Sequence, residues 1–418
     1  MQIGRRNDAR RRMTQAGVWT LGLALALCAA AGAAEAPIVN NPATPGGELE
    51  TLALRELWRV GGLDGELFFG VVGSVVADDA GNLYLLDTQL SEVQVLTSDG
   101  EYLRTIAREG EGPGEVRQPS DFYLAPDGRI GLLQGFPGKV VYVEQDGTPA
   151  GGFSIVQPGG QQGSMSVLVQ GNARGGEIYL AGIRMRFGGS SISQQTYFVS
   201  RYSPEGEELA TLATRDTEID YANFILTEAG LDFVWNGRWD IDPEGRVYCA
   251  PERNAYRIEV RAPDGTLERV ITREFETRGR TAEEKEVARR LVEVVGNQYP
   301  APPREIGIEE DEPDIMGMYC RPDGELWVRT SRSDHPRHAG EFLRFDVFDA
   351  EGRFTHQLAL AGPGDARQDA HHFIGGDRLV MVTGALDAYS TMHGASSEGA
   401  AGEAEVEPMQ VICYQLER

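Results

Sequence analysis

A short pattern recurs along this chain of 418 residues: an apolar run, a glycine-containing turn and a second apolar run. Asp-Gly-type turns supply the positive φ of a tight hairpin, and the flanking runs are rich in Val, Ile, Leu and Tyr. The first three turns are spaced 47 residues apart. The six hairpins centre on Gly81, Gly128, Gly175, Gly245, Gly324 and Gly376.

A second turn follows five of the six hairpins, as in "QVLTSDGEYLRTI" and "EVRAPDGTLERVI". The unit is therefore four strands, A to D, and a repeat of roughly 40–50 residues with four strands is typical of a β-propeller. The final "MQVICYQLER" supplies only a third strand to the last unit, and "LETLALRELWRVGG" has no other partner. We predict an all-β, six-bladed propeller over residues 50–418, with four-stranded antiparallel blades and an N-terminal strand that completes the last blade.

One insertion, residues 279–313 between blades four and five, is predicted to contain a helix at about 281–298. Thr281 and Glu284 form a capping box, and Gly296 lies at the far end. We expect the apolar stripe to pack on the blades, while a lid or a ridge for a partner is the alternative. The stripe consists of Val287, Leu291, Val294 and Val295.

The N-terminus is predicted to be a cleaved signal peptide over residues 1–34, followed by a linker over 35–49. Five arginines precede the apolar run "GVWTLGLALALCAAAG", which is too short for a comfortable membrane span. A retained signal anchor is an alternative. So is a lipoprotein, but Leu27 stands where a lipoprotein signal has Gly, Ala or Ser before its cysteine. We expect a periplasmic or extracellular monomer without a stable membrane span.

The net charge of −25 argues against nucleic acid or an anionic lipid surface as the partner. Three cysteines remain after the signal: Cys249, Cys320 and Cys413. They could form one disulfide with one free thiol left over, or no disulfide.

The stretch "GEGPGEVRQPSDFYLAPDGRI" resembles the linker and first hairpin of NHL-repeat propellers, and "RNAYRIEV" resembles the later half of that repeat. The chain is similar to exported bacterial six-bladed propellers, and related folds include TolB-like partners, lactonases and copper- or zinc-dependent lyases. The resemblance implies a fold and leaves the activity open.

In such blades the B–C and D–A connections share one face of the propeller, which we call the long-loop face. Long loops on a rigid scaffold commonly carry function, so we expect a binding site there and at the mouth of the central channel. "GEGPG" lacks the following Lys-Ser/Thr of a phosphate loop, which argues against a nucleotide site.

Arginine is enriched on the long-loop face, and its planar fork suits carboxylates or phosphates. These residues are our candidates for binding an anionic ligand, and internal pairing with loop Asp and Glu is the alternative. The candidate set is Arg117, Gln118, Arg184, Arg186, Arg253, Arg332 and Arg337.

Histidines gather on the same face, with aspartates nearby. His335, His338, His371 and His372 are the candidate ligands of a divalent ion, calcium or zinc. The alternative is that these histidines are solvated or packed in the channel.

Taken together, these patterns predict an exported binding or scaffold protein that holds a small molecule or a protein on the long-loop face, without catalysis of its own. The alternative is a metal-dependent hydrolase or lyase, lactonase-like or amidating-lyase-like, with a His/Asp site at the channel mouth.

Overall fold

The computed structural model describes residues 36–63, 65–155, 164–187, 189, 191–235, 237–335, 338–394 and 408–418. The predicted signal peptide lies outside these residues. In this part of the chain no helix is long and apolar enough to cross a membrane.

The first three blades follow in chain order, and each is an antiparallel four-stranded sheet. Blade one is β3 (Val72–Ala77), β4 (Leu83–Asp87), β5 (Glu92–Leu96) and β6 (Tyr102–Ile106). Blade two is β7 (Pro119–Leu124), β8 (Ile130–Gln134), β9 (Lys139–Val143) and β10 (Pro149–Ser154). Blade three is β11 (Ser164–Arg174), β12 (Glu177–Phe187), β13 (Ile192–Tyr202) and β14 (Glu208–Asp220).

The connections that lead into blades four and five are longer. Blade four is β16 (Trp239–Ile241), β17 (Val247–Cys249), β18 (Arg257–Arg261) and β19 (Leu267–Arg273). Blade five is β21 (Ile315–Cys320), β22 (Leu326–Thr330), β23 (Glu341–Phe348) and β24 (Phe354–Ala361). Blade six is β25 (Ala370–Ile374), β26 (Arg378–Val382), β27 (Gln410–Glu417) and the N-terminal β2 (Glu50–Gly61).

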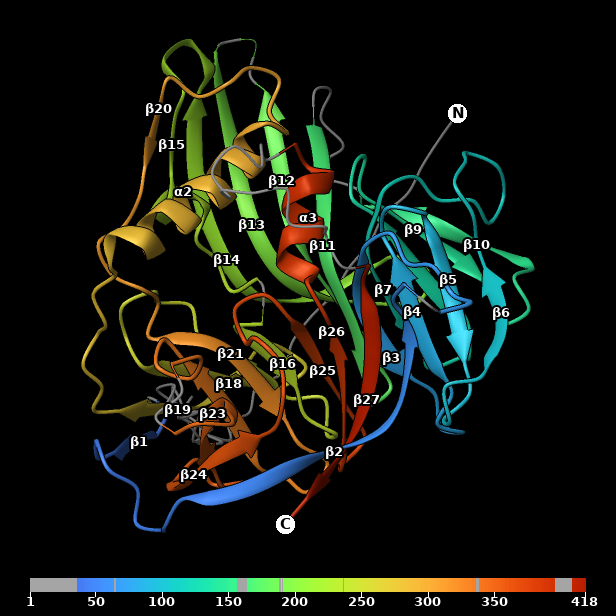
Figure 1. The fold of residues 1–418 in the computed structure, drawn as a ribbon. Coiled ribbons are helices and arrows are strands. Elements are labelled where there is room, and N and C mark those ends of the chain that lie inside the picture. The colour runs from blue at the N-terminus through green and yellow to red at the C-terminus, as the bar shows by residue number, and fades with distance from the viewer. Residues whose placement is uncertain are drawn as a thin grey trace, which may run out of the picture. The chain divides into compact units, whose positions relative to one another are not determined.

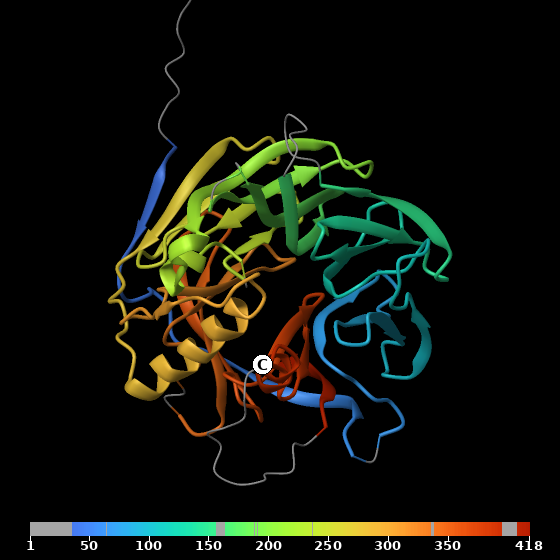
Figure 2. The same cartoon turned by 90° about the horizontal axis from the view of Figure 1, so that it is seen from above.

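Apolar clusters close the six blades into a ring, which Figure 2 shows from above. One buried cluster lies between each pair of consecutive blades. Leu86 and Phe122 belong to the cluster between blades one and two, and Leu85 and Val380 to the cluster that joins blade one to blade six. The predicted six-bladed propeller is confirmed.

The predicted closing strand is also confirmed. β2 pairs antiparallel with β27 from Ala53 to Gly61, so the two ends of the propeller share one blade. The first residues of β2, Glu50–Ala53, also pair in parallel with β24 of blade five. A single strand therefore ties blades five and six together (Figure 1).

Residues 35–49 were predicted to be a linker, but Ile38–Asn41 within them form a strand, β1, that pairs in parallel with β19. The outer edge of β19 offers unpaired backbone groups that this segment satisfies. The Asn41 side chain donates to the carbonyl oxygens of Thr272 and Gly352 at 3.0 Å each, and accepts from the Phe354 amide at 2.8 Å. We call residues 38–49 the strap, since they cross from blade four to blade five.

The inserted helix is confirmed as α2 (Ala282–Gly296), with both hydrogen bonds of the predicted capping box at Thr281 and Glu284. Its buried face differs from the predicted stripe. Ala288, Val292 and Val294 are buried, whereas Val287, Leu291 and Val295 are only partly buried.

α2 packs beside two short strands, β15 (Ile225–Thr227) and β20 (Glu305–Gly307), as Figure 1 shows. Phe224, Leu226 and Val292 form the core of this layer. It adjoins blade three, whose strands run 11 to 13 residues because "GIRMRF" and "ISQQTYF" belong to β12 and β13. The remaining elements are η1 (Tyr221–Asn223), α1 (Glu228–Leu231) and α3 (Ala385–Met392).

One buried and one partly buried aspartate join neighbouring inner strands. Asp121 of β7 accepts the Gly171 amide of β11 at 2.9 Å, and Asp240 of β16 accepts the Cys320 amide of β21 at 2.7 Å. β7, β11, β16 and β21 are each the edge strand of their sheet, so their outward amides need such partners.

Burial raises the pKa of Asp121 to about 6. The folded protein therefore binds more protons than the unfolded chain between about pH 4 and 6, and stability falls as the pH rises through this window. Between pH 4.5 and 7 the free energy of unfolding of the wild type should fall by about 2 kcal/mol through this effect, and the fall should be absent in Asp121→Asn. Urea unfolding of both proteins at the two pH values would measure it. Parallel pH profiles for the two proteins would contradict it.

Candidate functional site

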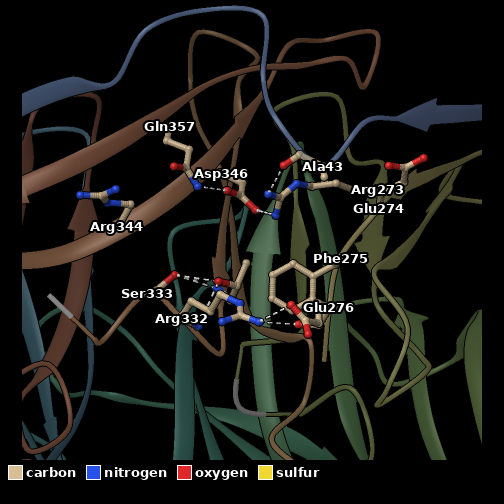
Figure 3. Close-up of a pocket in the computed structure, with 11 residues that line it drawn as sticks. Ala43, Arg273, Glu274, Phe275, Glu276, Arg332, Ser333, Arg344, Asp346 and Gln357 are labelled. Carbon is tan, nitrogen blue, oxygen red and sulfur yellow. Dashed lines mark hydrogen bonds and ion pairs between the residues drawn. The ribbon is translucent and has the colours of Figure 1, made fainter. Parts of the chain in front are cut away.

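A pocket of about 210 Å³ lies between blades four and five, near the long-loop face (Figure 3). Thr330, Arg332 and Ser333 enter it from the connection between β22 and β23. The other side is the segment that follows β19 and leads to α2, residues 274–276. Ala43 of the strap forms part of the outer wall.

Arg273 and Asp346 form an ion pair inside the pocket, with side chains only 9% and 3% exposed. Asp346 also accepts the Tyr256 hydroxyl at 3.0 Å and the Gln357 amide at 2.8 Å. Arg273 donates to the carbonyl oxygen of Ala43 at 2.8 Å. These bonds hold the guanidinium in place, and burial together with the Asp346 charge raises the pKa of Tyr256 well above its usual value.

The Arg273 side chain is not fully satisfied. Its Nε is buried and has no hydrogen-bond partner among the residues that the structure describes. A buried donor without a partner costs about 1–3 kcal/mol, so a ligand acceptor in the pocket would gain from this atom.

Two further arginines line the pocket and differ in their pairing. Arg344 is 9% exposed and forms a bidentate pair with Glu341 at 2.6 and 2.9 Å. Arg332 is 38% exposed, and the one ion pair the structure describes for it joins Glu276 at 3.8 Å. Because the Glu276 side chain is 94% exposed, this pair is weak.

A second polar cluster, the Glu284 cluster, consists of Glu284, Glu312, His335, Arg278 and Arg367. Arg278 pairs with Glu284 at 2.7 Å and with Glu312 at 3.0 Å, and Arg367 pairs with Glu284 at 2.8 Å. Ligand atoms of Glu284, Glu312 and His335 lie within 4.8 Å of one another, which is close enough to hold a metal ion.

The guanidinium groups already supply the positive charge of this cluster. Burial alone would raise the pKa of Glu284, but hydrogen bonds from Arg278, the Thr281 amide and Arg367 lower it to about 2. Burial raises the pKa of Glu312 and lowers that of His335. The cluster ties the first turn of α2 to the connections of blades five and six.

Glu284→Gln should therefore change the acid stability of the protein. Because the folded pKa of Glu284 is depressed, its contribution is fully present above pH 4.5 and is lost as the pH falls toward 2. Unfolding midpoints between pH 5 and 3 should fall more steeply in the wild type than in Glu284→Gln. Glu286→Gln, on the exposed side of the same helix, is the control and should follow the wild type.

The four histidines predicted as metal ligands are not brought together. His335 lies in the Glu284 cluster and His338 is exposed. The imidazole of His371 and the hydroxyl of Tyr319 form a hydrogen bond of 2.8 Å. Burial lowers the pKa of His371 strongly and that of His372 to about 4. Since consecutive residues of β25 point to opposite faces of the sheet, His371 and His372 cannot share one ion.

The predicted arginines do not converge either, and several have internal partners. Arg332 alone lines the pocket, Gln118 is exposed in the loop before β7, and Arg337 lies outside the described residues. The pairs and contacts are Arg117 with Glu111 at 2.7 Å, Arg184 with Glu208 at 2.8 Å, Arg253 with Glu228 at 2.9 Å, and Arg186 with Gln194.

Sequence reasoning missed Arg273 and Asp346, which lie on strands rather than loops. The available signal was a charged residue inside an otherwise apolar strand, as in "FLRFDVF".

The three cysteines Cys249, Cys320 and Cys413 are free and buried, so there is no disulfide among them. Burial raises the pKa of Cys249 to about 12 and that of Cys413 to about 11. In a Cys28→Ser protein we expect no reaction with a thiol reagent in the native state and three reactive thiols after unfolding. One reactive thiol after unfolding would indicate a disulfide instead.

Residues 66–149 match the model of a family described as 6-bladed beta-propeller. The chain is a six-bladed β-propeller. No curated protein matches this propeller. It is similar to a member of the duf4221 family from Bacteroides vulgatus, with 11% identity, a TM-score of 0.47 and coverage of 88% of this chain and 98% of that one.

Two further similar structures have described roles. Regucalcin from Agrobacterium tumefaciens, a calcium-binding protein, has 12% identity, a TM-score of 0.43 and coverage of 89% and 97% of the two chains. The gluconolactonase XC5397 from Xanthomonas campestris has 12% identity, a TM-score of 0.40 and coverage of 87% of each chain. Similarities this low carry no argument about the activity of this propeller.

Proposed function

We propose that this propeller is an exported binding protein that holds a small ligand in the pocket between blades four and five, without catalysis of its own. The observation that carries the proposal is Arg273, a buried and firmly held guanidinium at the pocket with one unsatisfied donor. Orienting polar groups on a rigid scaffold are what a small-molecule site requires.

The chemistry of the lining supports binding rather than catalysis. The pocket residues include no histidine or cysteine, and the Ser333 hydroxyl already accepts the Thr330 amide at 2.8 Å. A hydroxyl nucleophile would need a base within hydrogen-bond reach.

Blocking the pocket tests the proposal. Ala43 is exposed and lines the outer wall, whereas the neighbouring Thr44 is exposed and outside the lining. A panel of small molecules would be screened by thermal shift against the wild type, Ala43→Phe and Thr44→Phe. We expect ligands that stabilise the wild type and Thr44→Phe but not Ala43→Phe. Equal shifts in all three proteins, or no stabilising ligand at all, would exclude this pocket as the site.

Export remains part of the proposal and rests on residues 1–34. The mature protein recovered from the periplasm or medium of its host should begin near Glu35, as N-terminal sequencing would reveal. An intact Met1 on the recovered protein would refute cleavage.

A divalent ion at the Glu284 cluster, in a hydrolase or lyase, is the second candidate. It is favoured by the approach of His335 to two glutamates, and opposed by Arg278 and Arg367, which an ion would have to displace. Calorimetric titration with calcium and with zinc, on the wild type and Glu312→Gln, decides it. Stoichiometric binding that Glu312→Gln abolishes would support the metal site, and no binding would remove it.

A further inference from the structure

The charges inside the pocket leave one cation without a close partner. Arg273 is compensated by Asp346 and Arg344 by Glu341, and all four side chains are at most 9% exposed. Among the described residues, the charged partners of Arg332 are Glu276, in a long and exposed pair at 3.8 Å, and the buried Asp314, by a weaker long-range attraction. Arg332 is therefore the most weakly paired cation of the pocket lining, and a ligand anion would pair with it.

The unused donors of the pocket lie around one aromatic ring. The guanidinium carbon of Arg273 is 5.4 Å from the ring centroid of Phe275, and that of Arg332 is 5.5 Å from the same centroid. Arg332 uses one nitrogen to donate to the Glu276 carbonyl oxygen at 2.8 Å, and Arg273 retains the buried Nε. Figure 3 shows both side chains at Phe275. Donors for an oxyanion therefore adjoin an apolar surface.

We propose that the ligand is a small monocarboxylate with a short apolar or aromatic body. Its carboxylate is held by Arg332 and the Nε–H of Arg273, and its body lies against Phe275. This inference rests on the proposed function and names the class of ligand. Arginine is suited to the role because its planar donors match a carboxylate.

Size and charge narrow this class. The volume of about 210 Å³ is below the roughly 300–1,000 Å³ of sites for drug-sized ligands, so the ligand is small. A phosphate monoester carries about −1.5 to −2 at neutral pH, which is more negative charge than the weakly paired Arg332 alone would neutralise. The carboxylates of Glu274, Glu276 and Asp346 at the pocket would repel the excess.

Calorimetric titration of the purified protein with benzoate, benzamide and inorganic phosphate tests the inference. Benzoate and benzamide have nearly the same shape and differ in charge. We expect benzoate to bind at least about tenfold more tightly than benzamide or phosphate, as charge-assisted hydrogen bonds imply. Arg332→Gln should weaken benzoate binding at least about tenfold, while Arg289→Gln, on the exposed face of α2, should not change it.

The remaining outcomes overturn the inference in distinguishable ways. Equal binding of benzoate and benzamide, preferred binding of phosphate, or benzoate binding that Arg332→Gln leaves unchanged refutes a carboxylate ligand. If Ala43→Phe abolishes the binding of a ligand of another class found in the screen, the proposed binding function stands and only the carboxylate inference fails. The unfolding midpoint of Arg332→Gln should equal that of the wild type, which separates lost binding from lost folding.

Discussion

Asp346→Ala is expected to lower the free energy of unfolding by about 3–5 kcal/mol, the usual cost of removing one partner from a buried ion pair. The Arg273 side chain, which is 9% exposed in the native protein, would be left charged without its carboxylate, and the Tyr256 hydroxyl and Gln357 amide would lose their acceptor. Urea unfolding at pH 7 measures this loss. It should be accompanied by the loss of ligand binding, because Arg273 would no longer be held in place.

A double-mutant cycle separates the ion pair from the packing around it. Asp346→Leu and Arg273→Met should each be strongly destabilising, and the double variant should recover most of the loss, since no buried charge then lacks a partner. Additive effects would show that the two charges do not stabilise one another. An Asp346→Ala protein within 1 kcal/mol of the wild type would contradict a buried pair altogether.

Asn41→Ala is expected to cost about 2–4 kcal/mol, because it leaves buried backbone groups of two blades without partners. Asn41 is 8% exposed and its side chain bonds the carbonyl oxygens of Thr272 and Gly352 and the amide of Phe354. Loosening the strap should also weaken ligand binding, since Ala43 follows two residues later.

The matched control for this prediction is the adjacent, exposed Asn40. Asn40→Ala removes one exposed hydrogen bond to Thr272 and should change stability by less than about 0.5 kcal/mol. Chemical unfolding of the two variants side by side gives the comparison. Equal stability of Asn41→Ala and Asn40→Ala would mean that the strap contributes nothing to the joint between blades four and five.

The fold was predictable because local signals repeat. Each glycine turn between two apolar runs predicts a hairpin by itself, and the unpaired third strand at the C-terminus indicates the closing strand near Leu54. The capping box at Thr281 and Glu284 is equally local, and it places α2 correctly. The buried face of α2 was less predictable, because the layer around Leu226 that it packs against comes from a distant part of the chain.

The pocket was not predictable in the same way. Arg273 and Asp346 are 73 residues apart and belong to different blades, and only the packing of those blades makes them partners. Arg184 and Arg332 look alike as arginines on the long-loop side. Arg184 is buried and paired with Glu208, so it cannot bind a ligand. In the described part of the chain Arg332 has a long pair with the exposed Glu276, so it remains available. Such differences depend on tertiary contacts.

A crystal structure of the protein with 3-bromobenzoate would show whether the ligand lies between blades four and five, as we propose. The anomalous signal of bromine identifies the ligand without ambiguity. We expect to find the carboxylate at Arg332 and Arg273, with the ring beside Phe275. An empty pocket, with the same molecule bound at the Glu284 cluster or at the channel mouth, would contradict it.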